Sequence, residues 1–174
     1  ITSGSAILGT LTNATITIVD NDIGIQFAAT NFTVAEAGPN ANITVTRTGA
    51  TNTPVAVSFE TSDGTAVSGE DYQPQIGTLS FAAGETAKTF SITILDDPTV
   101  EVDETVNLRL SAPTGGAVLG GVATAVLTIV NDDTGVEFSA AIFTVGENQT
   151  NTLITVRRLG VTNTVFAVNF ATSD

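Results

Sequence analysis

One segment of the chain reads Ile94-Leu95-Asp96-Asp97-Pro98-Thr99-Val100-Glu101-Val102-Asp103-Glu104, and five of its residues are acidic. We refer to residues 94–104 as the acidic loop. Apolar and polar residues alternate on both sides of it, over residues 88–95 and 104–111. A period of two with β-branched side chains is typical of half-buried antiparallel strands. Carboxylates so close together repel one another, so such a loop is stable only if it is fully solvated or if a cation lies among the acids.

The composition favours an all-β chain and argues against several kinds of function. The chain has 174 residues, of which 42% are hydrophobic, enough to build a core. It contains neither cysteine nor histidine, which removes disulfides, thiolate metal sites and the usual catalytic bases, so we expect no enzyme activity. The net charge of −13 argues against nucleic acid as a partner and favours hard cations. No apolar run is long enough for membrane insertion.

The sequence contains an internal repeat with a period of 111 residues. Gly24-Ile25-Gln26-Phe27 recurs as Gly135-Val136-Glu137-Phe138, and Thr61-Ser62-Asp63 recurs as Thr172-Ser173-Asp174. A gapless repeat of this length indicates tandem domains.

Only one of the repeated units is complete in this sequence. We expect residues 1–22 to be the C-terminal strand of a preceding unit, residues 24–133 to be a complete domain, and residues 135–174 to be the N-terminal strands of a following unit. Neither flank has enough strands to close a core of its own. We therefore expect the sequence to be part of a longer polypeptide; completion of the flanks by another molecule is the less favoured alternative.

The complete unit is predicted to be an immunoglobulin-like, antiparallel, seven-stranded β-sandwich within a tandem repeat. Short alternating segments separated by turn-forming residues are typical of this all-β fold. The predicted strands span residues 25–36 (interrupted near Ala29), 42–48, 54–60, 76–82, 88–95, 104–111 and 123–130. The predicted core consists of Phe32, Val34, Ile43, Val45, Val55, Val57, Phe59, Leu79, Phe81, Phe90, Ile92, Ile94, Val106, Leu108, Leu110, Leu127 and Ile129.

A further segment, Gly69-Glu70-Asp71-Tyr72, is interpreted as a loop rather than as a binding motif. Tyrosine commonly packs its ring against apolar surface while its hydroxyl group finds a polar partner. We expect Tyr72 to pack over the end of a strand and to anchor this loop.

Acidic residues cluster at one predicted end of the sandwich. If the strands run up and down, alternate strands finish at the same pole. Calcium suits such a cluster because it accepts six to eight oxygen ligands in flexible geometry, whereas magnesium demands an octahedron. The alternative is that the acids are solvated and keep the surface soluble, but the repulsion among so many carboxylates favours a calcium site. The candidate metal ligands are Glu36, Asp63, Asp96, Asp97, Glu101, Asp103, Glu104, Asp132 and Asp133.

Several motifs of the complete unit occur together in one known family. They are Thr61-Ser62-Asp63-Gly64-Thr65-Ala66, Gly69-Glu70-Asp71-Tyr72, Gly77-Thr78-Leu79-Ser80-Phe81 with Gly84-Glu85, the acidic loop, and Val130-Asn131-Asp132-Asp133. The unit resembles a Calx-β domain, a module of sodium/calcium exchanger regulatory loops, integrin β4 and bacterial surface proteins. The resemblance implies calcium ligands at Glu36, Asp63, Asp96, Asp97, Glu101, Glu104, Asp132 and Asp133. Asn131 and Pro98 depart from the pattern, since family members often carry acids there.

The acids lie where one unit joins the next, because only Thr134 separates Asp133 from the following unit. Ca²⁺ at this junction would fix the angle between units. We therefore expect a calcium-binding structural or adhesive repeat of an extracellular or cell-surface protein, of bacterial origin, in which the ion stiffens a rod or filament. Its expected partners are calcium ions, neighbouring units of the chain and other copies in a filament. Two alternatives stay open: a calcium-sensing regulatory module, and accessory repeats attached to an enzyme domain outside this sequence.

Overall fold

The computed structural model describes residues 4, 10–18, 21–163 and 165–173. The described residues form β-strands and no helix. None of the described segments forms a helix that is long and apolar enough to cross a membrane. The strands are β1 (Ile23–Phe27), β2 (Asn31–Ala35), β3 (Asn40–Gly49), β4 (Val55–Asp63), β5 (Ile76–Phe81), β6 (Ala87–Thr93), β7 (Glu104–Thr114), β8 (Ala117–Leu119), β9 (Thr124–Val130), β10 (Thr134–Phe138) and β11 (Val156–Gly160).

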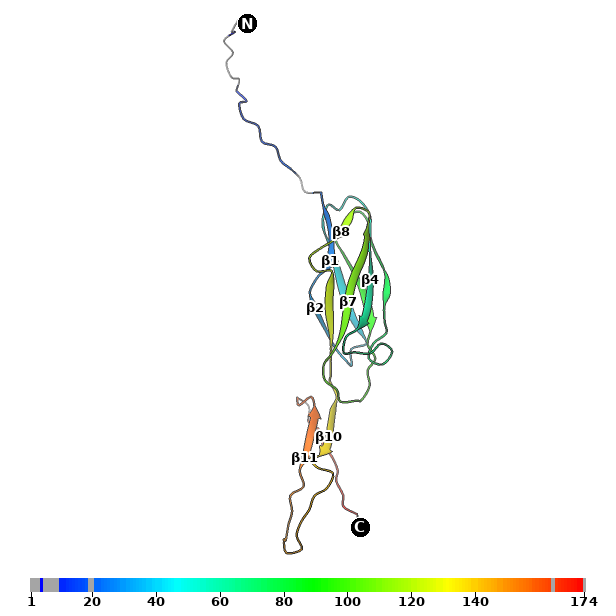
Figure 1. Cartoon of the computed structure of the whole chain (residues 1–174), viewed down its shortest axis with the longest axis vertical. Helices are drawn as coiled ribbons and strands as arrows, with labels where there is room; N and C mark the ends of the chain where they lie inside the picture. The colour runs from blue at the N-terminus through cyan, green and yellow to red at the C-terminus, as the bar shows by residue number, and fades with distance from the viewer. Residues whose placement is uncertain (1–3, 5–9, 19–20, 164, 174) are drawn as a thin grey trace.

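Strands β1 to β9 form two sheets that pack face to face (Figure 1). One sheet has the order β6-β3-β1-β8 and the other the order β2-β9-β7-β4-β5. Apolar residues alternate with polar ones along each strand, so that each sheet presents one apolar face to the other. The predicted all-β, immunoglobulin-like sandwich is confirmed.

The first predicted strand differs from expectation, because it divides between the two sheets. The chain leaves β1 after Phe27, crosses over residues 28–30, and enters the other sheet as β2. Each half pairs in parallel with a strand from the C-terminal part of the sandwich: β1 pairs with β8, and β2 pairs with β9. Strand β8 lies between the predicted strands 104–111 and 123–130, where no strand was expected. The sandwich is therefore antiparallel except for these two pairs.

The core is close to the predicted one. Every predicted core residue is buried except Phe32 and Val34, which are partly buried and pack against its margin. The rings of Phe59 and Phe90 stack across the sandwich with centroids 4.0 Å apart. Tyr72 has no exposed surface, so its predicted role as an anchor is confirmed.

Beyond the sandwich, β10 and β11 form a two-stranded antiparallel ribbon. Strand β10 occupies the repeat position of β1, shifted by the sequence period, and β11 occupies the end of the position of β3. Before residue 22, the described residues form no strand. The division into a preceding, a complete and a following unit stays a prediction.

Candidate metal centre

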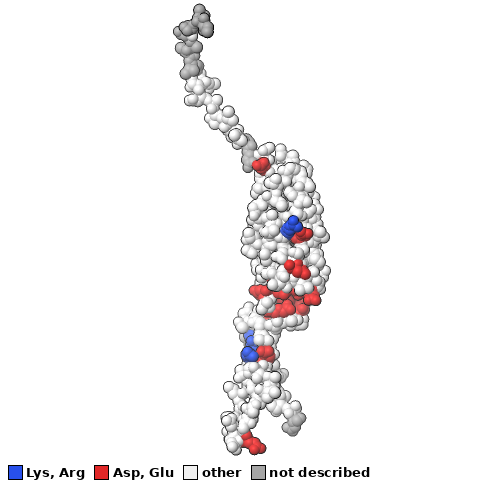
Figure 2. Space-filling model, viewed as in Figure 1, with Lys and Arg blue, Asp and Glu red and all other residues white. Residues whose placement is uncertain are grey.

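The acidic residues gather at the end of the sandwich that faces the β10–β11 ribbon (Figure 2). Strands β2, β4, β6 and β9 finish at this end, and β7 begins there, as their pairing registers require. We call this end the acidic pole. Two groups of three carboxylates form within it.

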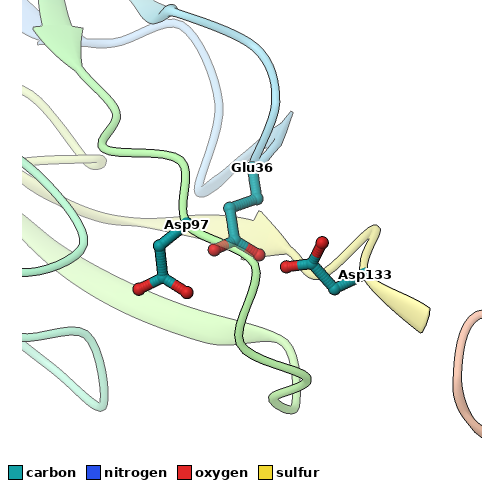
Figure 3. A group of neighbouring side chains, drawn as sticks. All are labelled: Glu36, Asp97 and Asp133. Carbon is teal, nitrogen blue, oxygen red and sulfur yellow. The ribbon is translucent and has the colours of Figure 1, made fainter. Parts of the chain in front are cut away.

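The first carboxylate group consists of Glu36, Asp97 and Asp133 (Figure 3). One carboxylate oxygen from each residue lies within 4.8 Å of those of the other two. Glu36 follows β2, and its backbone N–H donates to Val130 O at 3.0 Å, which fixes the residue beside the end of β9. Asp97 comes from the acidic loop, and Asp133 directly precedes β10. Three separate parts of the chain thus present oxygen atoms to one point.

Glu36 is the most deeply buried member of this group, with 6% of its surface exposed. No hydrogen-bond donor reaches its carboxylate among the described residues. Burial, followed by the negative charges of Asp133 and Asp97, raises the pKa of Glu36 to about 7. An ionised carboxylate in this position needs a positive partner, since burying a charge without one is costly.

The other two members differ in their hydrogen bonding. Partial burial and the charges of Asp132 and Asp96 raise the pKa of Asp133. The pKa of Asp97 is lowered by its hydrogen bonds from Thr99, whose backbone N–H donates to Asp97 Oδ1 at 2.6 Å. These hydrogen bonds favour the ionised form of Asp97.

The second carboxylate group consists of Asp71, Glu101 and Glu104, with ligand oxygens again within 4.8 Å of one another. Burial, a hydrogen bond with Asp71 and the charge of Asp71 raise the pKa of Glu104 to about 7. Burial and the charges of Asp71 and Asp97 also raise the pKa of Glu101. In the absence of a cation, Glu104 therefore keeps its proton to a higher pH than an isolated glutamate does.

Five of the nine sequence-predicted ligands belong to these groups: Glu36, Asp97, Glu101, Glu104 and Asp133. Asp63, Asp96, Asp103 and Asp132 also lie at the acidic pole, but outside both groups. Asp103 Oδ1 accepts a hydrogen bond from Asn131 N at 3.2 Å. Asp96 and Asp132 act on the first group through their charges.

Asp63 has protein donors of its own. Its Oδ1 accepts hydrogen bonds from Ser68 N at 3.0 Å and from the Tyr72 hydroxyl group at 2.7 Å. Burial and the hydrogen bond to Asp63 raise the pKa of Tyr72 to about 12, so the hydroxyl group remains a donor.

Sequence reasoning missed Asp71, because it lies in the segment interpreted as a tyrosine-anchored loop. One signal could have identified it. A tyrosine that packs over a strand end at the acidic pole must bring its neighbour in the chain to the same pole, and that neighbour is Asp71.

Asn131, which departs from the family pattern, is 7% exposed and organises the pole through its amide group. Its Oδ1 accepts a hydrogen bond from Glu101 N at 3.3 Å. Because Asn131 also donates its backbone N–H to Asp103, it fixes the acidic loop against the end of β9. An uncharged side chain here positions carboxylates without adding to their repulsion.

The acidic loop also contacts the ribbon. Added methyl groups on Gly135 and Gly160 would lie 3.0 Å and 2.8 Å from the Val100 side chain, so Val100 packs directly over both glycines. Asp133 O accepts a hydrogen bond from Val161 N at 3.0 Å. The first carboxylate group is thus joined to β10 and β11 by an apolar contact and by backbone hydrogen bonds.

The donor set of both groups is made of carboxylate oxygens only. Such ligands suit hard cations, and their irregular arrangement around a loop suits calcium better than an octahedral ion.

The sequence profile of the Calx-beta domain matches residues 18–134 and residues 130–174. The sodium/calcium exchanger Calx of Drosophila melanogaster is 35% identical over 114 residues, which cover 66% of this chain and 12% of the exchanger. Adhesion G-protein coupled receptor V1 of Danio rerio is 32% identical over 164 residues, which cover 90% of this chain and 3% of the receptor. The chain therefore spans only a small part of these relatives.

Solved structures show the same similarity. The crystal structure of the apo-form Calx CBD1 domain superposes with a TM-score of 0.63 at 35% identity, covering 64% of this chain and 99% of that domain. The structure of CBD12 from CALX1.2 superposes with a TM-score of 0.62 at 31% identity, covering 76% of this chain and 55% of that one. With the profile match over most of its length, a shared sandwich and this degree of identity, the chain belongs to the Calx-beta domain family.

Proposed function

We propose that the acidic pole binds calcium ions through the two carboxylate groups, with Glu36, Asp97 and Asp133 holding one ion and Asp71, Glu101 and Glu104 another. The observation that carries this proposal is Glu36, a buried carboxylate that no described donor compensates and that faces two further carboxylates. A divalent cation supplies the missing positive charge. Asp96 and Asp132 would strengthen the negative potential at the first group.

The relatives support calcium rather than another hard cation. Two of them are sodium/calcium exchangers, from Drosophila melanogaster and Bos taurus. A further solved structure, the calcium binding domain CBD12 of CALX1.1, superposes with a TM-score of 0.62 at 33% identity. The proposed function is binding and not catalysis.

Ion binding would act through residues of this chain that join the pole to the ribbon. A cation removes the repulsion between Asp97 and Asp133 and draws the acidic loop toward Glu36. The Val100 contact with Gly135 and Gly160 is then held in place, since Val100 belongs to the same loop. Calcium would therefore restrain the ribbon relative to the sandwich.

Two biological uses of this restraint follow, each with its own support. In the first, the chain is a calcium-stiffened, adhesive or filament-forming repeat of a cell-surface or secreted protein of bacterial origin. The match to an adhesion receptor over 90% of this chain supports the cell-surface repeat, and the absence of cysteine fits the bacterial origin. In the second, the chain is a calcium-sensing regulatory module; its likeness to exchanger domains supports it. A stiffening site should stay saturated at constant calcium, whereas a sensor needs an affinity near the signalling concentration.

Calorimetric titration of the whole 174-residue chain with calcium tests the proposal. We expect two binding steps, of which Glu36→Gln abolishes one and Glu104→Gln the other. Glu85→Gln, at the opposite end of the sandwich, is the matched control and should leave both steps intact. Absence of calcium binding by the unaltered chain would refute the function, and the measured dissociation constant decides between the stiffening and the sensing role.

A further inference from the structure

The loop between β4 and β5 is closed by hydrogen bonds next to the second carboxylate group. We call residues 63–72 the Asp63–Tyr72 loop. Asp63 Oδ1 accepts hydrogen bonds from Ser68 N at 3.0 Å and from the Tyr72 hydroxyl group at 2.7 Å, which closes the two ends of the loop on each other. The Tyr72 ring is fully buried, which holds its hydroxyl group in place, whereas Asp63 and Ser68 are exposed.

One end of the Asp63–Tyr72 loop positions Asp71. The Asp71 carboxylate accepts a hydrogen bond from Val67 N at 2.6 Å through Oδ2. Its backbone oxygen accepts a hydrogen bond from Leu95 N at 2.9 Å, at the start of the acidic loop. The next residue, Tyr72, forms a β-bridge with Ile94. The orientation of Asp71 is thus set by contacts within this loop and by its junction with the acidic loop.

The other end of the loop is bound to the residue that follows Glu104. Gly64 N and Ala66 N both donate to Thr105 O at 3.1 Å. The hydroxyl group of Thr65 accepts a hydrogen bond from Thr105 N at 2.8 Å. A methyl group added to Gly64 would lie 2.4 Å from Thr105 O, so only glycine permits this approach. The loop therefore spans the distance between Asp71 and the base of Glu104.

We propose that Asp63 and Tyr72 are positioning residues for the second carboxylate group, holding Asp71 and Glu104 at the separation that an ion needs without contacting the ion themselves. This inference rests on the proposed calcium binding. It also gives Asp63 a role different from that of a metal ligand, since its Oδ1 is already occupied by two protein donors. Partners that orient ligands from behind typically change metal affinity by about 10–100-fold when they are removed.

The composition of the chain offers a selective probe. Tyr72 is the only tyrosine and there is no tryptophan, so terbium luminescence excited through tyrosine reports on ions bound near Tyr72. Terbium bound by Asp71, the adjacent residue, is therefore the main source of signal. Loss of the signal in Glu104→Gln and its retention in Glu36→Gln would assign it to the second group.

The decisive comparison is between Asp63→Ala and Asp63→Asn in the whole chain. Asparagine keeps an oxygen acceptor for Ser68 and Tyr72 but has no charge, whereas alanine has neither. We expect Asp63→Ala to weaken terbium affinity by about tenfold or more, and Asp63→Asn to remain near the unaltered chain. Calcium titration of Tyr72→Phe, which keeps the ring and loses the donor, should show the same weakening of one binding step only.

The possible results separate the two proposals. If Asp63→Asn loses as much affinity as Asp63→Ala, Asp63 is a ligand and the positioning role is wrong. If Asp63→Ala does not fold, an unaltered second binding step in Tyr72→Phe would contradict the positioning role equally. If the unaltered chain binds neither terbium nor calcium, the proposed calcium-binding function is wrong. If it binds both ions and no variant at Asp63 or Tyr72 alters the affinity, only the positioning role is wrong.

Discussion

The charged side chains at the two poles of the sandwich have different partners. At the pole opposite the acids, Glu85 pairs with Lys88 at 2.8 Å and also accepts a hydrogen bond from Ala82 N, and these contacts lower the pKa of Glu85. Arg47 is buried there with two of its nitrogen atoms donating to Ala50 O. At the acidic pole, Glu36 and Glu104 have pKa values raised to about 7.

The two poles differ in whether their carboxylates have positively charged partners in the chain. At the first pole, Glu85 has a positive partner in Lys88, and Arg47 donates to a backbone oxygen although its Nη1 has no hydrogen-bond partner among the described residues. The carboxylates of the acidic pole find mainly one another, and their mutual repulsion opposes the folded state. Only the acidic pole should therefore respond to an added cation, and the predictions below use this contrast.

Calcium removal should have the largest effect. An ion present at a hundred times its dissociation constant stabilises the folded state by about 2.7 kcal/mol per site, or about 5 kcal/mol for the two groups. We expect the melting temperature of the whole chain to fall by on the order of 10 °C or more when chelator replaces calcium. Glu36→Gln should remove about half of this difference, whereas Glu85→Gln should keep all of it. Equal melting temperatures in calcium and in chelator would show that the acidic pole, like the opposite pole, does not respond to calcium.

The pH dependence in chelator should be the next largest effect. The pKa of Glu36 rises from 4.5 to about 7 on folding, so the folded state binds more protons than the unfolded state between these values. The free energy of unfolding should therefore fall as the pH rises from about 4.5 to about 7, by on the order of 1–3 kcal/mol for this residue. Glu104 contributes in the same direction.

Melting in chelator between pH 5 and pH 8 measures this effect, with Glu36→Gln as the control that should flatten the curve. In saturating calcium, the stabilisation by the ion should instead grow over the same range, since protons compete with it for the carboxylates. A melting temperature in chelator that increases from pH 5 to pH 7 would contradict the raised pKa values.

A pair of glycines at equivalent repeat positions sharpens the comparison. Gly49 and Gly160 have φ values of 79° and 72°, and added methyl groups would meet Asp22 O and Asp133 O, respectively. Alanine at either position should cost about 1–2 kcal/mol. We expect Gly160→Ala to weaken calcium binding in a titration, because it displaces Asp133, and Gly49→Ala to leave calcium affinity unchanged. If the two variants bind calcium with equal affinity, the ribbon has no influence on calcium binding by the first carboxylate group.

The smallest effect is expected at the pole without the acidic cluster. Lys88→Ala breaks an ion pair whose side chains are both partly exposed. Pairs of this kind contribute about 0–1 kcal/mol to stability, so chemical denaturation should show a change of at most about 1 kcal/mol. The loss should be the same in calcium and in chelator, and a calcium-dependent loss would mean that the poles are coupled.

The sequence predicted the strands, the core and the acidic pole well, because alternating burial and turn residues leave a direct pattern. It did not predict the crossing of residues 28–30 between sheets, since a strand that changes sheet keeps the same alternation on both sides. It also did not distinguish Asp63 from Asp71. Both are acids near one strand end, and the difference depends on the direction of the Tyr72 hydroxyl group, which no local pattern specifies.

The parallel pairing of β2 with β9 has a mechanical consequence. These strands lie near the beginning and the end of the sandwich and share five paired positions, from Asn31 with Val126 to Ala35 with Val130. Tension applied to the two ends of the sandwich would pull them in opposite directions along their length. Their hydrogen bonds would then be loaded together in shear rather than opened one after another, so the sandwich should yield abruptly and at high force when it is stretched.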